Sequence, residues 1–374
     1  MKFVILLTGG RSGSDLLQSL LDWHTQILQF PGFFRFDKPF VDILNEKDPQ
    51  KMSEMFCDLN PHFFDSRIEW EGRPDLGERH DMLGENKNEF YKFSEKTFKK
   101  NFVYFYQNSK KKKIDKLIAL HKAYAKTSNQ NLSKKKIIIL HLHLIEHFKS
   151  FIKTFNKFHN FKILLTLRDP LVSLCSTVKH WKKYKAGKFL NIKSMYGNID
   201  MHVNIWNDLY EFRKKLSIIQ LENLHLKSNK VLRDLCKLLK INYKNSLKRS
   251  TYFNKIWWGD AVSEKFLKGL NPKFKNKFNN KLFFDKDISI IENKIKDVLT
   301  NYNYPLRSNN KKNIKYNIFL PFKFELIVWL NNLKIKNFKQ SLLIPYFLIK
   351  RSMILLQKNL YSKNELPYSI GTKK

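Results

Sequence analysis

The chain has 374 residues, of which 70 are Lys or Arg and 33 are Asp or Glu, and its formal net charge at pH 7 is +37. Hydrophobic residues make up 43% and aromatic residues 14%, which excludes a disordered polybasic tail and is enough for one large domain or two smaller ones. The three cysteines stand apart without CxxC spacing. This excludes a disulfide scaffold and a cysteine-based zinc site, and it indicates a reducing compartment.

The basic excess comes mostly from lysine, since only 11 of the 70 basic residues are arginine. Lys, Asn, Ile and Phe all have A/T-rich codons, so the base composition of the coding sequence is one source of this charge. A positive field attracts anionic substrates, cofactors and membrane surfaces. Proteins that read nucleic acid favour arginine, whose planar fork binds phosphate and guanine in a bidentate way. We therefore expect no specific nucleic-acid partner.

Apolar strands and amphipathic helices alternate along most of the chain. Residues 2–8 form a short β-rich apolar run, and a glycine turn at 9–14 leads into leucines at helical spacing over 15–24. Further strands are predicted at 135–144, 161–167 and 216–221, and further helices at 114–128, 145–158, 171–184, 228–239 and 288–300. This alternation predicts an α/β fold in which a parallel sheet forms the middle of three layers.

Two regions depart from the alternation. Residues 35–110 lack clear periodicity, and we interpret them as an inserted, partly helical region within a main domain of residues 1–310. Residues 311–374 carry 13 basic and two acidic residues around apolar runs. They predict a basic, amphipathic, helical C-terminal extension that either lies on a membrane or packs against the main domain. Because no stretch of 18 uncharged apolar residues occurs, we expect no membrane-spanning helix.

The glycine loop at residues 9–14 is the first candidate anion site. It is not a Walker A loop, because Ser14 rather than a lysine follows Gly13, and its cation, Arg11, precedes that glycine. A strand, a glycine loop and a helix in succession are typical of sites where main-chain N–H groups bind phosphate. The alternative is a tight turn without a ligand.

A second candidate anion site follows the predicted strand at 161–167. Arg168 stands at the carboxyl end of that strand, where open α/β sheets bind ligands. Ser176 lies eight residues later, about two helical turns into the next helix, and could face the same crevice. The alternative is a surface salt bridge for Arg168 and backbone capping for Ser176. The presence of the glycine loop favours the anion-binding interpretation.

Together these motifs resemble the sulfotransferase family, which uses 3′-phosphoadenosine 5′-phosphosulfate (PAPS) as sulfonate donor. Residues 8–17 (TGGRSGSDLL) are similar to the family's 5′-phosphosulfate loop. Residues 167–176 (LRDPLVSLCS) are similar to its 3′-phosphate motif, in which an Arg and a Ser eight positions later bind that phosphate. Weaker similarity is found at residues 219–224, 231–241, 257–259, 284–291 and 301–306. The resemblance covers residues 2–306 and leaves 311–374 outside.

The resemblance implies a P-loop NTPase-like sulfotransferase fold and an enzyme that transfers sulfonate from PAPS to an acceptor hydroxyl. It assigns the 3′-phosphate to Arg168 and Ser176. It assigns the 5′-phosphosulfate to the loop residues Gly10, Arg11, Ser12, Gly13, Ser14 and Asp15. Asp15 departs from the family pattern, which has Thr or Ser there. A carboxylate repels the anion unless it turns away, and we expect it to cap the helix that follows.

The transfer also needs a base for the acceptor hydroxyl. Some family members place a Glu shortly after the first helix, where this chain reads Phe-Pro-Gly at residues 30–32. Others use a His at the end of the second strand, which corresponds to His141 and His143. Alternation along a strand puts both on one face, and we expect His143, nearer the strand end, to be the base. His80 and Glu85 in the insert are reserve candidates.

Two alternatives exist for the histidine pair. Either histidine can be a structural side chain of a buried strand. The pair can also bind a metal ion, but no third ligand has a clear spacing, so we expect no metal.

The sequence thus predicts a nucleotide-binding transferase of the cytoplasm, with a hydroxyl-bearing acceptor. We expect a sugar or glycan first, then a lipid or small alcohol, then a tyrosine. Residues 35–110 are expected to lie on the acceptor side, and residues 311–374 to make peripheral membrane contact. The alternatives are a P-loop kinase-like, ATP-dependent phosphotransferase and a non-enzymatic protein that binds polyanions or membranes, whose association would fall steeply with salt.

Overall fold

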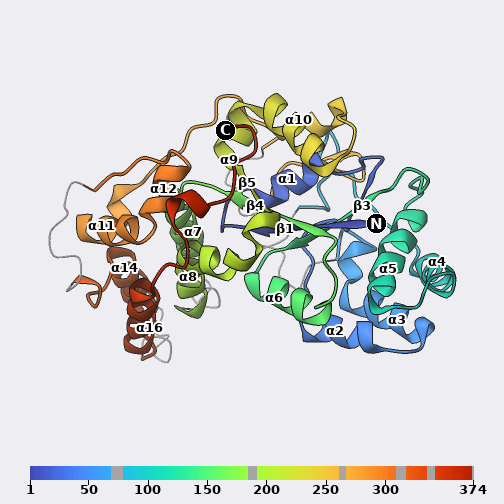
Figure 1. The fold of residues 1–374 in the computed structure, drawn as a ribbon, viewed down its shortest axis with the longest axis horizontal. Helices are drawn as coiled ribbons and strands as arrows, with labels where there is room; N and C mark the ends of the chain where they lie inside the picture. The colour runs from blue at the N-terminus through green and yellow to red at the C-terminus, as the bar shows by residue number, and fades with distance from the viewer. Residues whose placement is uncertain (69–78, 184–191, 261–266, 309–316, 335–341, 373–374) are drawn as a thin grey trace.

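The computed structural model describes residues 1–68, 79–183, 192–260, 267–308, 317–334 and 342–372. At its centre lies a five-stranded parallel sheet in the order β2-β3-β1-β4-β5 (Figure 1). The strands are β1 (Lys2–Thr8), β2 (Ile27–Leu28), β3 (Ile137–Leu142), β4 (Phe161–Leu167) and β5 (Leu216–Gln220). The predicted α/β class with a parallel sheet is confirmed.

Helices cover both faces of this sheet, so it forms the middle of three layers (Figure 1). Those of the main body are α1 (Ser14–Leu20), α2 (Lys38–Asn45), α3 (Pro49–Leu59), α4 (Glu95–Gln107), α5 (Lys113–Thr127), α6 (Ile145–Thr154), α7 (Pro170–Lys183), α8 (Ile192–Asp208), α9 (Leu221–Leu226) and α10 (Ser228–Leu239). Towards the C-terminus follow α11 (Asp285–Lys294), α12 (Lys296–Asn301), α14 (Lys323–Lys334) and α16 (Ile344–Leu356). A short antiparallel pair, β6 (Thr251–Tyr252) and β7 (Lys255–Ile256), lies apart from the sheet.

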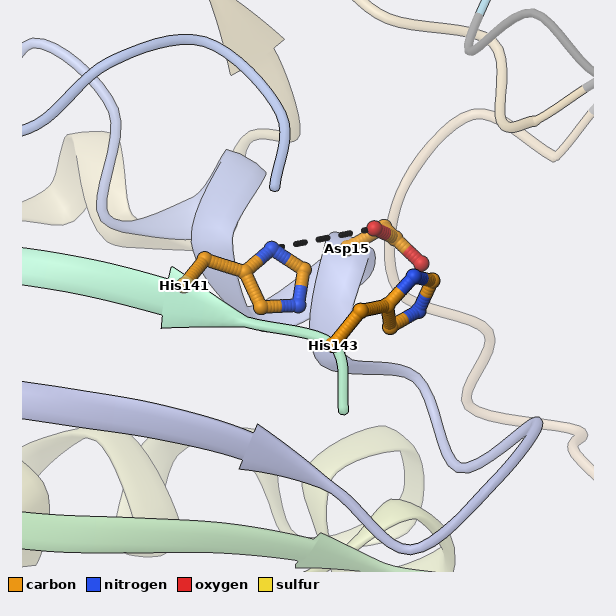
Figure 2. A group of neighbouring side chains, drawn as sticks. All are labelled: Asp15, His141 and His143. Atoms are coloured by element: carbon orange, nitrogen blue, oxygen red, sulfur yellow. Dashed lines mark ion pairs between the residues drawn. The ribbon is translucent and has the colours of Figure 1, made fainter. Parts of the chain in front are cut away.

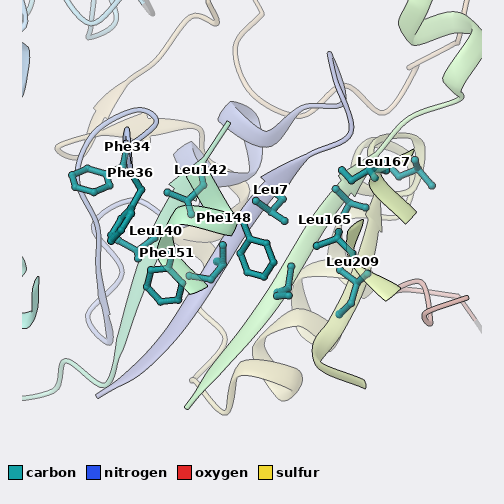
Figure 3. Packing of buried hydrophobic residues seen from close by; sticks show 14 of the residues in the cluster. Leu7, Phe34, Phe36, Leu140, Leu142, Phe148, Phe151, Leu165, Leu167 and Leu209 are labelled. Atoms are coloured by element: carbon teal, nitrogen blue, oxygen red, sulfur yellow. The ribbon is translucent and has the colours of Figure 1, made fainter. Parts of the chain in front are cut away.

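Alternate residues of β1 enter two separate hydrophobic clusters. Phe3, Ile5 and Leu7 belong to a large cluster that contains the aromatic side chains of α2, α3 and α6. Figure 3 draws Leu7 together with Phe148 and Phe151 of α6. Val4 and Leu6 belong to a second cluster with the leucines of α1 and α10. Side chains of a strand alternate between its faces, and both faces are covered here. This explains why β1 reads as an uninterrupted apolar run.

The observed elements differ from the predicted ones in several places. β2 has only two residues, too few to leave a pattern in the sequence. α8 and the three helices α2, α3 and α4 inside residues 35–110 were not predicted individually. β3 ends at Leu142, two residues before the predicted end. The predicted helix after Arg168 is confirmed as α7, which begins at Pro170 because the first turn needs no N–H from that residue.

The chain's last described residues return to the central sheet. Ser369 pairs with Ile218 of β5 in a parallel bridge, and the N–H of Ile370 donates to the carbonyl of Ile218 at 2.8 Å. The Ile370 side chain is buried in the same cluster as α10. The C-terminus therefore lies beside β5 and α10 (Figure 1). Among the described residues, no helix has both the length and the apolarity that crossing a bilayer requires.

Because Ile370 is buried, we predict that Ile370→Ala lowers the free energy of unfolding by about 2–4 kcal/mol, the usual range for a large-to-small change in a core. Chemical denaturation monitored by circular dichroism measures this. Lys363→Ala, an exposed position in the same segment, is the matched control and should change stability by less than about 0.5 kcal/mol. Equal unfolding curves for the two variants would contradict the docking of the C-terminus.

Candidate functional site

The loop between β1 and α1 has a left-handed backbone at three positions. Gly10, Arg11 and Gly13 have φ angles of 71°, 44° and 85°. A Cβ atom on Gly13 would lie 2.4 Å from Cδ1 of Leu221, so both the φ angle and the space require glycine there. Arg11 adopts this region without being glycine, a conformation that costs free energy and is concentrated at functional sites.

This loop presents a continuous run of unpaired main-chain donors. The N–H groups of residues 11–16 form no hydrogen bond with any part of the chain that the structure describes. The N–H groups of Gly9 and Gly10, by contrast, donate to the Thr166 carbonyl and the Thr8 hydroxyl. Successive free N–H groups in a turn with left-handed residues form a concave site for an anion.

The Ser12 side chain turns inward and fixes the loop. Its hydroxyl lies 3.0 Å from the hydroxyl of Thr8 and 2.8 Å from that of Thr166 in β4, and it accepts from the N–H of Gly9 at 3.1 Å. The Ser173 hydroxyl of α7 donates to the Gly10 carbonyl from the other side, at 2.5 Å. Because its hydroxyl connects β1 to β4, Ser12 can contribute to anion binding only through its main-chain N–H.

Arg11 and Arg168 lie close together at the carboxyl ends of neighbouring strands. Burial lowers the pKa of Arg168, the charge of Glu222 raises it, and the nearby charge of Arg11 lowers it again. Arg11 is 3.7 Å from the carboxylate of Asp260. Two guanidinium groups whose charges interact repel each other, and an anion bound between them would offset that repulsion. The structure thus brings together the cations of the two predicted anion sites.

Glu222, the second residue of α9, is the acceptor around which the Arg168 side of the site is built. Its carboxylate accepts from the N–H of Asp169 at 3.0 Å, from the hydroxyl of Tyr304 at 3.1 Å and from the amide of Asn276. The Asn276 carbonyl oxygen in turn accepts from Nε of Arg168 at 3.1 Å. Glu222 therefore positions Arg168 through Asn276. The sequence similarity at residues 219–224 includes Glu222 but did not assign it a function.

The helix α7 carries Ser176, the other residue predicted to bind the 3′-phosphate. Asp169 caps this helix by accepting from the N–H groups of Leu171 and Val172, at 3.1 and 3.3 Å, and its carboxylate also pairs with Arg307. Ser176 is partly buried and lies three residues after Ser173, which contacts the glycine loop. Positions three apart share a helix face, so Ser176 is on the side of α7 that faces this loop.

His141 lies on the face of β3 that is covered by α1, where it meets Gln18. The Gln18 side-chain nitrogen donates to the carbonyls of Phe30 and Gly32 at 2.9 and 2.7 Å. The atom of Gln18 that lies 2.8 Å from Nδ1 of His141 is therefore its oxygen, which only accepts. Nδ1 therefore carries the proton. The other ring nitrogen, Nε2, is buried and has no hydrogen-bond partner among the described residues. Burial lowers the pKa of His141 well below its usual range, as does the adjacent His143.

Asp15 and His143 complete a cluster around His141 (Figure 2). Asp15 Oδ1 lies 3.8 Å from Nδ1 of His141, and a ring nitrogen of His143 is turned toward the Asp15 carboxylate. His143 is partly buried and is the first residue after β3, whereas His141 lies within the strand. The centroids of the two imidazole rings are 5.3 Å apart. Asp15 makes no capping hydrogen bond, which corrects the expectation that it caps the helix; Gly13 is the N-cap residue.

This cluster has two chemical capabilities. A carboxylate beside two imidazoles can orient a neutral histidine that takes up a proton. The same three groups offer ligand atoms within 4.8 Å of one another, so they could also hold a divalent metal ion. Sequence reasoning found no third ligand for the histidine pair. Asp15 supplies one because the glycine loop and the end of β3 lie side by side.

Two further residues at the site were missed, and two reserve candidates can now be placed. Gln18 follows Asp15 by one helical turn, and His202 of α8 places its Nε2 3.1 Å from the position of a Cβ on Gly10. Burial lowers the pKa of His202 to about 4. The ring of His80 packs 4.1 Å from that of Tyr252, close to Gln18, whereas Glu85 is exposed and pairs with Lys268. No sequence motif marks Gln18 or His202.

Comparison with known proteins gives structural similarity alone. No family model and no curated protein matches the sequence. The chain is similar in structure to the sulfotransferase domain from the curacin biosynthetic pathway, with a TM-score of 0.41 and 14% identity, over 82% of this chain and 99% of that one. It is also similar to the sulfotransferase domain of the Synechococcus olefin synthase, with a TM-score of 0.41 and 12% identity, over 82% of this chain and 95% of that one.

We predict that Ser12→Ala lowers the free energy of unfolding by about 1–3 kcal/mol, because buried hydroxyl and N–H groups lose their partner. Denaturant unfolding measures the change. Ser53→Ala is the matched control, since Ser53 is equally buried but only donates to a carbonyl of its own helix. The two variants should differ by at least about 1 kcal/mol. If they destabilise the protein equally, the Ser12 hydroxyl does not hold the loop.

Proposed function

We propose that the chain is a sulfotransferase that moves a sulfonate group from PAPS to an acceptor hydroxyl. The observation that carries the proposal is the pairing of two anion sites at one edge of the sheet. The N–H groups of residues 11–16, which have no partner in the described part of the chain, start at Arg11, and Arg168 lies close enough for the charges of the two arginines to interact. PAPS carries a phosphate on the 3′ oxygen of its ribose and a phosphosulfate on the 5′ oxygen. A donor such as ATP, with one phosphate chain on the 5′ oxygen, would occupy only one of the two anion sites.

In this proposal the loop holds the 5′-phosphosulfate and Arg168 with Ser176 holds the 3′-phosphate. Arg11 and the free N–H groups stabilise the charge that develops as sulfur leaves the phosphate oxygen. Glu222 and Asn276 keep Arg168 in place before the donor binds, so less conformational entropy is lost on binding. The contact of Asp15 with His141 supports the proposal, because this carboxylate faces the imidazole and accepts no hydrogen bond from the loop N–H groups.

We assign the base to His143, with Asp15 and His141 as positioning residues. The acceptor oxygen forms a bond to sulfur, the bond between sulfur and the 5′-phosphate oxygen breaks, and the hydroxyl proton moves to His143. The second product is adenosine 3′,5′-bisphosphate. His143 is partly buried, whereas His141 is buried and bonded to Gln18, so His143 is the histidine that a substrate reaches. No metal ion takes part in this mechanism.

For the acceptor we propose a sugar hydroxyl. The ring of Phe33, which is partly buried, lies 4.8 Å from that of His143. Binding sites for organic ligands combine such aromatic surfaces with a few polar groups. Residues 35–110 would then contribute to the acceptor side, since His80 and Tyr252 lie next to the Gln18 network.

The test is transfer of radiolabelled sulfonate from PAPS to a panel of sugars, glycans, alcohols and tyrosine peptides, with ATP as the competing donor. The proposal expects labelled product with PAPS and none with labelled ATP. Phosphoryl transfer from ATP that requires Mg²⁺ would overturn it in favour of a phosphotransferase.

We predict that Arg168→Ala raises KM for PAPS by about ten-fold to a hundred-fold, the loss of one charge-assisted hydrogen bond worth about 1.5–3 kcal/mol. The effect on kcat is smaller, because Arg168 contacts the phosphate that does not react. Steady-state kinetics on a responsive acceptor measures both constants. Arg233→Ala, an exposed arginine on α10, is the control and should behave as wild type. Equal effects of the two substitutions would contradict the 3′-phosphate role.

We predict that His143→Gln lowers kcat by about 10²–10⁴-fold while KM for PAPS is preserved, as expected when a general base is lost. His159→Gln, an exposed histidine, is the control.

Wild-type activity should survive treatment with a chelator, and added Zn²⁺ should inhibit it, because the ion would occupy the nitrogen that accepts the proton. Loss of activity on chelation, with recovery on adding metal, would show instead that the cluster works as a metal site.

A further inference from the structure

A stripe of exposed apolar side chains follows one face of α16. Tyr346, Ile349, Met353 and Leu356 belong to the helix, and Leu342 and Leu360 lie just beyond its two ends; we call these six residues the α16 apolar face. The four members within the helix are separated by three, four and three positions, the spacing that keeps side chains on one side of a helix. Their exposed fractions range from 55% for Leu356 to 66% for Met353.

The opposite face of α16 is anchored, which fixes the direction of the apolar face. Phe347, Ile354 and Leu355 are buried, and the helix packs against α8. The guanidinium of Arg351 is fully buried, pairs with Glu325 at 2.8 Å and donates to two carbonyls of the segment that precedes α14. A partner of α16 must therefore approach its outer side, with no rearrangement of the helix.

Other exposed apolar side chains lie in the neighbouring segment. Of the 21 large hydrophobic residues that are exposed in the described chain, 11 fall within residues 319–360. Besides the α16 apolar face they comprise Phe319, Leu320, Trp329, Leu330 and Leu343. Single exposed apolar residues are ordinary, but a concentration of this kind marks a surface that contacts a membrane or another protein.

The charge around the α16 apolar face indicates which kind of partner binds there. Residues 342–360 contain no acidic residue, and Lys350 and Lys358 are exposed among the apolar side chains. The whole chain carries a net charge of +37, so two copies brought together through this face would repel each other, whereas an anionic surface would attract them. α16 has 13 residues, too few for the roughly 20 that span a bilayer, so it would lie in the plane of the surface.

We propose that the α16 apolar face docks the protein on the surface of a membrane that contains anionic lipids. The apolar side chains enter the boundary between headgroups and acyl chains, the hydroxyl of Tyr346 lies at the interface, and Lys350 and Lys358 contact the headgroups. The inference is independent of the sulfonate-transfer chemistry, because it rests on a surface formed by other elements.

The test is co-sedimentation of the full chain with vesicles of phosphatidylcholine alone and of phosphatidylcholine with phosphatidylserine, at two salt concentrations. We expect binding to the anionic vesicles, and at least a ten-fold loss of affinity in the double variant Tyr346→Ser, Met353→Ser. The matched control, Tyr104→Ser with Leu226→Ser, removes exposed apolar side chains elsewhere and should bind as wild type. Thermal unfolding of each variant shows that the fold is retained.

Three results would overturn the proposal. The first is the absence of binding to anionic vesicles. The second is equal binding by the two double variants, which would mean that general attraction to the basic chain is responsible. The third is a stable dimer in light scattering that the Tyr346→Ser, Met353→Ser variant abolishes, which would assign the face to a second copy of the chain.

Discussion

The bond between the hydroxyls of Ser12 and Thr166 connects the two halves of the candidate site. It joins the glycine loop after β1 to the penultimate residue of β4, and both side chains are buried. Arg11 precedes this contact by one residue and Arg168 follows it by two, so the two guanidinium groups are brought together by a fully buried connection. The candidate site is therefore held in place by the surrounding core without a ligand, which reduces the conformational entropy that binding would cost.

Around this connection, acceptors and donors divide into two groups. On the β4 and β5 side, Glu222 organises Asp169, Asn276 and Tyr304 and so fixes Arg168. On the β3 side, Gln18 fixes the proton of His141 on Nδ1, and Nε2 has no hydrogen-bond partner within the described ranges. The first side thus positions a guanidinium group, and the second positions an imidazole. The proposed transfer would use the first for the anionic donor and the second for the acceptor hydroxyl.

Much of the scaffold could be predicted from sequence, because its signals are local. Apolar runs at residues 2–8 and 161–167 and the proline at the start of α7 depend on nearby residues alone. The side-chain directions at the site could not be predicted in this way. Whether Asp15 caps its helix or meets His141 depends on β3, which is more than a hundred residues away. α16 was recognised as a basic apolar segment, but which face it exposes follows from the buried Arg351 and Glu325 pair.

The most direct test of the account is a calorimetric titration of the wild-type chain with adenosine 3′,5′-bisphosphate and with 5′-AMP at two salt concentrations. If Arg168 and Arg11 form two sites for one ligand, the bisphosphate binds at least about ten-fold more tightly than 5′-AMP. This ratio should persist at high salt, because a formed site is screened less than the general field of the chain. Weak binding of both nucleotides that falls alike with salt would contradict the account and leave a basic surface without a donor site.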